Sequence, residues 1–203
     1  MLRLTFHDQL PESLWPQGGQ RWMAVVSRLL RQPDNQWWDD EETDAVVEDR
    51  DMVLSEAMRD ARDELTRTLA LSPKQWSWGR LHQLELENQS LGRSGFGPVR
   101  AIFNRGPFEV GGGGASVDAT NWDASQGYDV TSAPSMRMVV DLAHPDRSRW
   151  VNLTGASGHV ASGHYRDQTP LWVKGDTLAW AFGRRPVLAA TEDRLVLEPR
   201  PNG

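Results

Sequence analysis

The apolar residues in the first third of the chain recur at the spacing of a helix. Over Trp22–Leu30 they lie three or four positions apart, and Pro33 then breaks the pattern. A cleaner apolar stripe runs over Leu54–Leu69, with charged residues on the opposite side, and ends before Pro73. Because this period places apolar side chains on one helical face, we expect a mainly helical segment over residues 1–75.

Two adjacent tryptophans, Trp37 and Trp38, lie between these helices in a turn-rich stretch. An indole ring buries a large apolar area when it packs against neighbouring elements. We therefore expect this pair to dock into a crevice of the fold rather than to stack on a ligand.

After Trp78 the pattern changes from helical to extended. Leu81–Leu86 alternates imperfectly and predicts a strand, and Pro107–Val110 predicts a short extended piece. Gly111–Gly114 predicts a turn or a flexible link, because glycine adopts backbone conformations that other residues avoid. We expect residues 76–203 to form a β-rich C-terminal segment of the same domain.

The clearest strand pattern runs over Ser135–Leu142, where neighbouring side chains point to opposite faces. One face carries Met136, Met138, Val140 and Leu142, and the other carries Arg137, Val139 and Asp141. Residues 143–146 resemble a hairpin connection to a second strand over Arg149–Leu153. The tail from Thr169 onward predicts an extended segment wrapped over a surface, with Trp172, Trp180 and Phe182 among Gly and Pro.

The predicted fold class is α+β, with a helical first third and a β-rich remainder. A single hairpin with short extended pieces makes a poor independent sheet, since a stable sheet needs three or more strands with a covered face. The pattern therefore indicates that these strands join a sheet supplied by other residues.

Composition and charge exclude several functional classes. The 203 residues carry ten tryptophans and a net charge of −6, which disfavours non-specific binding to nucleic acid or to an anionic membrane. The chain has no cysteine, which excludes disulfides and thiolate chemistry. No segment reaches the ~20 apolar residues of a membrane helix. The composition does not locate the protein in a compartment.

Titratable residues give little sign of a metal or cofactor site. The carboxylates over residues 39–64 are typical of a solvated face, which we favour over metal binding. The five histidines have no i, i+4 spacing of the kind that a metal site on one helix uses: His7, His82, His144, His159 and His164. We expect no cofactor, and no metal bound through histidine.

The segment Gly155–His159 invites comparison with a hydrolase nucleophile elbow, but its second glycine is one position early and no strand-to-helix turn is predicted there. Ser157, His164 and Asp167 offer the residue types of a catalytic triad without a spacing that fixes its geometry. We favour a Gly-rich turn after a strand, and a buried polar network around His164. Gly111–Gly114 lacks the Lys-Ser/Thr ending of a phosphate-binding loop.

Several ordered motifs together resemble the C-terminal end of the penicillin acylase (penicillin amidase) family. They are Trp78–His82, Asn104–Pro107, Gly111–Gly114, Val117–Asn121, Ser135–Asp141, Arg149–Asn152, Gly155–His159, His164–Gln168 and Trp172. The resemblance covers the chain from about Trp76 onward and, more weakly, the first third. Val160 departs from it, because many relatives have Pro at that position.

The resemblance implies an N-terminal-nucleophile hydrolase with a four-layer αββα sandwich, whose sheets the C-terminal strands complete. In this family a new N-terminal Ser attacks the amide while its own α-amine serves as base. That Ser opens a Ser-Asn-x-Trp-like segment, and Thr120–Trp122 is only a decoy for it. The resemblance therefore carries no catalytic residue to this chain, and the implied partner is the remaining acylase chain that holds the Ser.

The favoured hypothesis is thus the C-terminal portion of an amide hydrolase, inactive alone, that buttresses an acyl pocket. In it Arg137, Asp141, His164 and Asp167 make buried polar or ionic contacts rather than chemical steps. One alternative is a free-standing binding or assembly module with several exposed tryptophans. A weaker one is an independent hydrolase that uses Ser157 or Thr120. Expressed alone, the chain is expected to pair with itself over bare strand edges.

Overall fold

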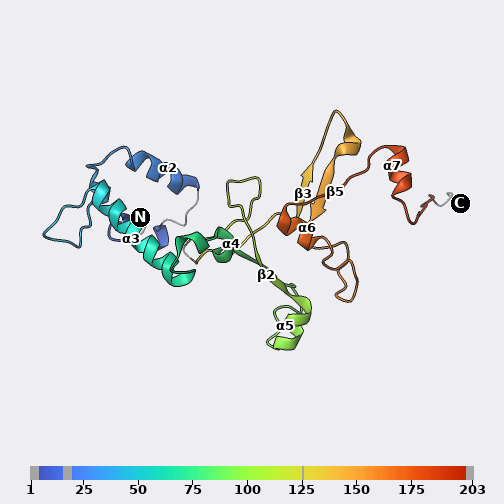
Figure 1. Cartoon of the computed structure of the whole chain (residues 1–203), viewed down its shortest axis with the longest axis horizontal. Helices are drawn as coiled ribbons and strands as arrows, with labels where there is room; N and C mark the ends of the chain where they lie inside the picture. The colour runs from blue at the N-terminus through green and yellow to red at the C-terminus, as the bar shows by residue number, and fades with distance from the viewer. Residues whose placement is uncertain (1–4, 16–19, 125, 200–203) are drawn as a thin grey trace. The chain divides into compact units, whose positions relative to one another are not determined.

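A computed structural model describes residues 5–15, 20–124 and 126–199 of the chain. Backbone contacts divide it into two units, Met1–Ala133 and Pro134–Gly203, which are described separately below. Helices and small antiparallel sheets are mixed in the chain, which confirms the α+β class (Figure 1). None of the described helices combines the length and apolar character that a membrane crossing requires.

The first unit contains most of the helices and one two-stranded sheet. Its elements are η1 (Glu12–Leu14), α2 (Gln20–Leu29), η2 (Gln36–Trp38), α3 (Arg50–Thr68), η3 (Pro73–Gln75), α4 (Trp78–Leu81), β1 (Gln83–Leu86), α5 (Gly97–Phe103) and β2 (Arg105–Glu109). The second unit contains β3 (Met136–Val139), η4 (Pro145–Arg147), β4 (Arg149–Asn152), α6 (Thr169–Lys174), β5 (Leu178–Ala179) and α7 (Arg184–Ala189).

Helices α2 and α3 lie where the apolar periodicity predicts them. Asp49 caps α3, because its carboxylate accepts the backbone N–H groups of Asp51 and Met52. These two helices account for 10 and 19 residues, and turns and irregular stretches separate them. The mainly helical segment over residues 1–75 stays a prediction.

The core of the first unit forms where these helices meet the chain around η2. Its buried residues are Phe6, Leu29, Trp38 and Val53, with Leu10, Trp22 and Trp37 packed against them. The indole N–H of Trp38 donates to the Gln32 carbonyl at 2.8 Å, so the deeply buried ring keeps its polar group satisfied. The expected docking is confirmed for Trp38, whereas Trp37 is only half-buried.

The predicted extended pieces near residues 81–86 and 107–110 form the antiparallel pair β1–β2. Helix α5, between these strands, was not predicted. Pro98 stands in its first turn, where a missing N–H costs nothing and the fixed φ favours a helix. A proline that marks a break elsewhere therefore starts a helix here.

The second unit is built on a three-stranded antiparallel sheet in the order β3-β4-β5. The predicted hairpin is confirmed: Met136 faces Asn152 and Met138 faces Trp150 across β3 and β4. Helix α6 packs on β4, and Val151 and Trp172 are almost fully buried in this unit.

The prediction of an extended tail after Thr169 was wrong. The structure has helix α6 at once, then the two-residue strand β5 and the short helix α7. Pro170 stands in the first turn of α6, and Gly175 ends it in the left-handed conformation, with φ of 79°. Both signals are local, and the apolar pattern alone missed them.

Candidate functional site

The loop after β4 holds Ser157, His164 and Asp167, but it does not join them into a catalytic relay. Nδ1 of His164 lies 2.8 Å from Oδ2 of Asp167. Oγ of Ser157 accepts the backbone N–H of His159 at 3.1 Å. Among the described residues no hydrogen bond joins the Ser157 hydroxyl to the His164 ring. The irregular turn expected after the strand is confirmed.

The His164–Asp167 pair is exposed, which corrects the expectation of a buried network. Their side chains are 75% and 38% accessible. At Gly155 a Cβ would meet the His164 carbonyl at 2.0 Å, so the loop folds its backbone inward there and leaves the imidazole outside. The hydrogen bond that the His164 ring donates to the Asp167 carboxylate, together with the negative charge of that carboxylate, raises the pKa of His164.

Arg137 and Asp141 make structural contacts, and both are half-buried rather than buried. The Arg137 guanidinium donates to the Trp172 carbonyl at 2.9 Å and lies 4.7 Å from the centre of the same indole. Asp141 Oδ1 accepts the backbone N–H groups of Ala143 and His144, at 3.0 and 2.9 Å, and so shapes the hairpin turn. Their expected role in polar contacts is therefore observed.

The sheet of the second unit exposes its more apolar face. Met136 and Met138 on β3 are 42% and 54% exposed, and Leu178 on β5 is 37% exposed. The register places Trp150 opposite Met138 and beside Leu178. The face that carries Arg137 is the one packed against Trp172. The alternation places Met136 and Met138 on one face, and the structure leaves both side chains about half exposed, although Trp150 on the same face lies 6.3 Å from the Trp180 ring.

A buried histidine organises the loops of the first unit. His82 is fully buried, and its Nδ1 donates to the Tyr128 carbonyl, with the two atoms 2.6 Å apart. Its Nε2 lies 2.9 Å from the Thr120 hydroxyl, which also donates to the Gly111 carbonyl at 2.7 Å. The ring stacks on Trp78 with centroids 4.6 Å apart. These contacts tie three chain segments together around one side chain.

Thr120 is therefore unsuited to be a surface nucleophile, because its side chain is fully buried and already hydrogen-bonded. The Gly111–Gly114 segment is held against it as an ordered turn. Gly112 has φ of 92°, and a Cβ there would meet the Asp118 carbonyl at 2.1 Å. The glycine at this position is thus required by both conformation and space.

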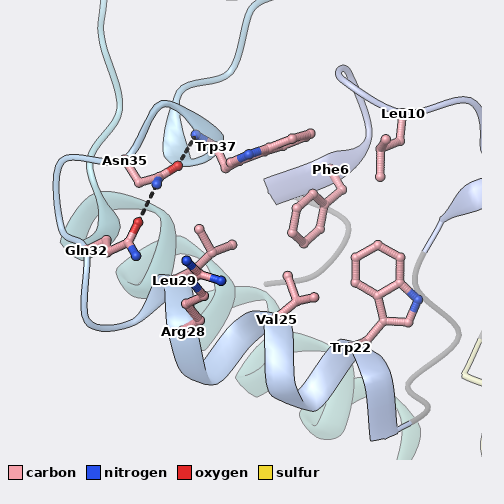
Figure 2. Close-up of a pocket in the computed structure, with 9 residues that line it drawn as sticks. All are labelled: Phe6, Leu10, Trp22, Val25, Arg28, Leu29, Gln32, Asn35 and Trp37. Atoms are coloured by element: carbon pink, nitrogen blue, oxygen red, sulfur yellow. Dashed lines mark hydrogen bonds between the residues drawn. The ribbon is translucent and has the colours of Figure 1, made fainter.

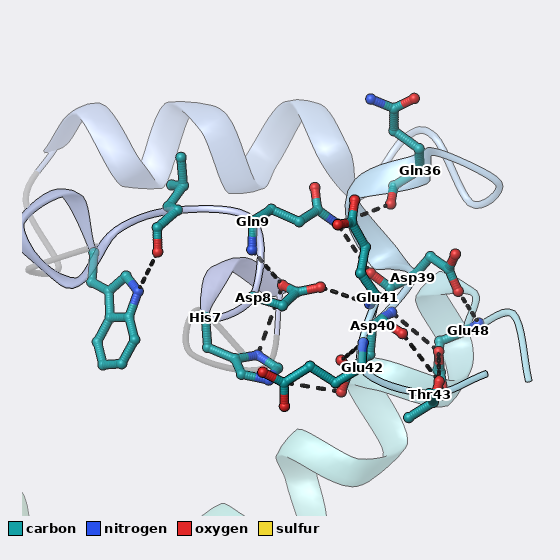
Figure 3. A network of polar contacts seen from close by, with 12 residues as sticks. His7, Asp8, Gln9, Gln36, Asp39, Asp40, Glu41, Glu42, Thr43 and Glu48 are labelled. Carbon is teal, nitrogen blue, oxygen red and sulfur yellow. Dashed lines mark hydrogen bonds and ion pairs between the residues drawn. The ribbon is translucent and has the colours of Figure 1, made fainter.

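A second polar cluster joins the N-terminal stretch to the acidic stretch after η2 (Figure 3). Asp8 accepts the backbone N–H of Glu41 at 2.8 Å, and the His7 ring lies 3.7 Å from the Asp40 carboxylate. His7, Asp40 and Glu42 place one potential ligand atom each within 4.8 Å of one another. A divalent cation uses such donors, but exposed acidic groups commonly gather without one, and the His7 ring also contacts Asp8, at 3.9 Å.

The first unit also has an apolar pocket of about 470 Å³ beside α2. In Figure 2 the Phe6 ring lies between the indoles of Trp22 and Trp37, with centroid distances of 5.2 and 5.5 Å. The remaining lining residues are Leu10, Val25, Arg28, Leu29, Gln32 and Asn35. Its interior is aromatic and aliphatic, and one cation stands among its lining side chains.

Sequence reasoning missed these two polar centres and the pocket for a common reason. His82 and Thr120 lie 38 residues apart, and Asp8 and Glu41 lie 33 apart, so no local period links them. One local signal was available: Trp78 and His82 are four residues apart, the spacing that lets rings meet on one helical turn.

Comparison with known proteins shows which family the chain resembles. The family model described as penicillin amidase matches residues 1–189. Similar proteins include the acyl-homoserine lactone acylase QuiP of Pseudomonas aeruginosa, 30% identical over 84% of this chain and 22% of its own length. The QuiP of Pseudomonas putida is 29% identical over 97% of this chain and 24% of its own.

A third similar protein is the penicillin acylase 2 proenzyme of Pseudomonas sp. strain SE83, 33% identical over 80% of this chain and 19% of its own length. The chain thus spans about a fifth to a quarter of the length of these curated relatives.

Proposed function

Because the chain belongs to the penicillin amidase family, we propose that it is the C-terminal portion of a larger amide hydrolase. In this role it completes the core sheet of an αββα sandwich and buttresses the acyl pocket. The nucleophile is an N-terminal Ser outside this chain, so the chain alone is inactive. Residues 1–75 and 76–203 are then a helical and a β-rich segment of one domain.

The partial exposure of Met136 and Met138 on one face of the β3-β4-β5 sheet is the observation that carries this proposal. Full burial of a methionine side chain stabilises a fold by roughly 1.5–3 kcal/mol, a gain that Met136 and Met138 realise only in part at their present exposure. Strand β3 is also an edge strand, with backbone groups open to further pairing. Both features fit a sheet that continues into other residues.

The proposed chemistry is hydrolysis of an amide bond between an acyl group and an amine. The Ser hydroxyl attacks the carbonyl carbon, its proton passes to the α-amine and then to the leaving amine, and an acyl ester forms. Water then cleaves the ester to the carboxylic acid and restores the Ser. By their names, the relatives act on acyl-homoserine lactones and on penicillins. We take an N-acyl compound as the substrate class.

In this proposal the described side chains of the chain stabilise its fold and take no part in the chemical steps. Arg137 fastens β3 to α6, and Asp141 holds the turn of the hairpin. Ser157 and Thr120 have no part in bond cleavage. Thr120 is fully buried and its hydroxyl donates to the Gly111 carbonyl, so the neighbouring His82 ring serves packing there rather than attack on a substrate. Ser157 accepts a backbone N–H, and among the described residues its hydroxyl has no hydrogen bond to a base.

The alternative of a free-standing binding module requires several exposed tryptophans. All ten tryptophans lie within the described residues, and each is buried or half-buried. The structure therefore offers no observation that favours this alternative over the family function.

Amide hydrolysis by the chain alone and by the complete acylase tests the proposal. We expect no turnover of a chromogenic N-acyl anilide by the chain alone, and turnover when it is produced together with the acylase sequence that carries the N-terminal Ser. Met138→Glu is expected to prevent assembly, whereas Met58→Glu, at a residue 72% exposed on α3, serves as the matched control. Turnover by the chain alone, or labelling of Ser157 by a serine-directed reagent, contradicts the proposal.

A further inference from the structure

We propose that the pocket beside α2 binds a carboxylate ligand with an apolar acyl chain. Such a molecule is the acid that amide hydrolysis releases, and only this source of the ligand rests on the proposed function. Three features of the pocket favour binding itself: its apolar interior, the positive charge of Arg28 at its lining and the amide donor of Gln32.

The interior of the pocket suits an apolar chain. Its volume of about 470 Å³ lies in the range of small-molecule sites. Phe6 is 3% exposed and fixed between Trp22 and Trp37, so these walls are held by packing (Figure 2). Val25 lines the same pocket yet is 38% exposed, which leaves apolar surface for a ligand to cover.

The polar lining points to an anionic head group. Arg28 is the single ionic side chain among the described lining residues, and no acidic side chain lines the pocket. Within the described part of the chain, Arg28 has neither an ion pair nor a side-chain hydrogen bond. The chain has a net charge of −6, so most cations have acidic neighbours to pair with. The unpaired Arg28 guanidinium beside the apolar pocket can therefore bind an anion.

A second donor lies in the turn that follows α2. Gln32 comes three residues after the last residue of this helix, Leu29, and lines the same pocket as Arg28. Its Oε1 accepts the Asn35 amide at 2.6 Å, which turns its NH₂ group toward other acceptors. A carboxylate can therefore accept from the Arg28 guanidinium and from the Gln32 amide while its chain occupies the aromatic interior.

The same features disfavour other ligands. A neutral hydrocarbon would cover the polar part of the lining without making an interaction with Arg28. A cationic ligand would be repelled by the positive charge of Arg28. An acidic peptide would need a longer groove than the nine lining residues provide. The combination of one cation, one free amide donor and three aromatic rings fits a single carboxylate on an apolar tail.

Calorimetric titration of the full chain with sodium octanoate tests the proposal, with octanamide as the uncharged ligand of matched length. We expect octanoate to bind about tenfold more tightly than octanamide, a ratio that corresponds to about 1.4 kcal/mol. Arg28→Gln is expected to remove this difference by weakening octanoate alone. Arg31→Gln, which removes a neighbouring cation that does not line the pocket, should change neither affinity.

A second variant addresses the apolar interior. Val25→Trp fills the pocket from an exposed position on α2 and is expected to abolish binding of both ligands while the far-ultraviolet circular dichroism stays unchanged. The proposal is overturned if octanoate does not bind at millimolar concentration, if octanamide binds equally well, or if Arg28→Gln leaves octanoate affinity unchanged. None of these results depends on amide hydrolysis, so the two proposals fail separately.

Discussion

Two histidines, one in each unit, show how burial decides what the same side chain does. His82 is fully enclosed and bonds to a backbone carbonyl and to a neutral hydroxyl. The His164 side chain is 75% exposed and bonds to a carboxylate. Trp78, Leu81 and Leu84 flank His82 in the sequence, whereas polar residues surround His164. The structure assigns the first to the interior of a unit and the second to its surface.

The comparison separates interactions that hold the fold from those that water can replace. Removing a buried polar group leaves its partners without solvent to take its place, whereas an exposed ion pair is worth little. The four predictions below test this difference at paired positions, from the largest expected effect to the smallest.

Replacement of His82 is expected to have the largest effect. His82→Ala removes the donor to the Tyr128 carbonyl and opens a cavity beneath Trp78. We expect the free energy of unfolding to fall by about 3–4 kcal/mol in urea titrations followed by tryptophan fluorescence. The matched change His164→Ala should leave it nearly unchanged. Equal losses of stability at both positions would contradict the expected difference between the buried and the exposed histidine.

Two glycines with positive φ sharpen the comparison between the units. Gly112→Ala forces a Cβ toward the Asp118 carbonyl, at 2.1 Å, whereas Gly175 has open space around the same added atom. Both changes carry the backbone cost of the left-handed region, about 1 kcal/mol. We expect a total loss of about 2–3 kcal/mol for Gly112→Ala and about 1 kcal/mol for Gly175→Ala. Thermal melts of the two variants measure the difference.

The two faces of the β3-β4-β5 sheet should respond differently in the isolated chain. Val151→Ala removes buried methyl groups, since Val151 is 0% exposed, and should cost about 2 kcal/mol. Met138→Ala, at a side chain that is 54% exposed, should cost less, at most about 0.5 kcal/mol. A large loss for Met138→Ala in the chain alone would show that this face is already packed.

The smallest effect is a pH dependence at His164. Asp167 raises the pKa of this ring above its ordinary value of 6.5, so the pair favours the folded state when the ring is protonated, at pH values below 6.5. The contribution is lost as the pH rises through the raised pKa. Asp167→Asn is expected to lower the His164 pKa toward 6.5 in an NMR titration. An unchanged titration curve would show that the pair does not form in solution.

The sequence was sufficient for elements that carry a strong period and insufficient for contacts between distant segments. The alternation over Ser135–Leu142 predicted β3 and its hairpin partner, and the apolar spacing predicted α2 and α3. The short helices α5 and α6 were missed because their signals are capping residues rather than a period.

The candidate site was harder to predict for a physical reason. Side chains that meet across 33 to 46 residues leave no local pattern, as with His82 and the Tyr128 carbonyl or Asp8 and Glu41. The sequence placed the right residues in the loop after β4, but it could not show that the His164 ring faces solvent. It also placed Met136 and Met138 on one face of the strand without revealing how much of that face the unit leaves exposed.

The half-exposed methionines of β3 supply the most direct measurement of the proposed role. Met136 and Met138 can be oxidised with hydrogen peroxide and followed by mass spectrometry, in the chain alone and in the complete acylase. The account predicts that both react readily in the chain alone, at a rate near that in urea, and at least about tenfold more slowly in the complete enzyme. Equal oxidation rates in the two samples would contradict the claim that this sheet continues into the rest of an acylase.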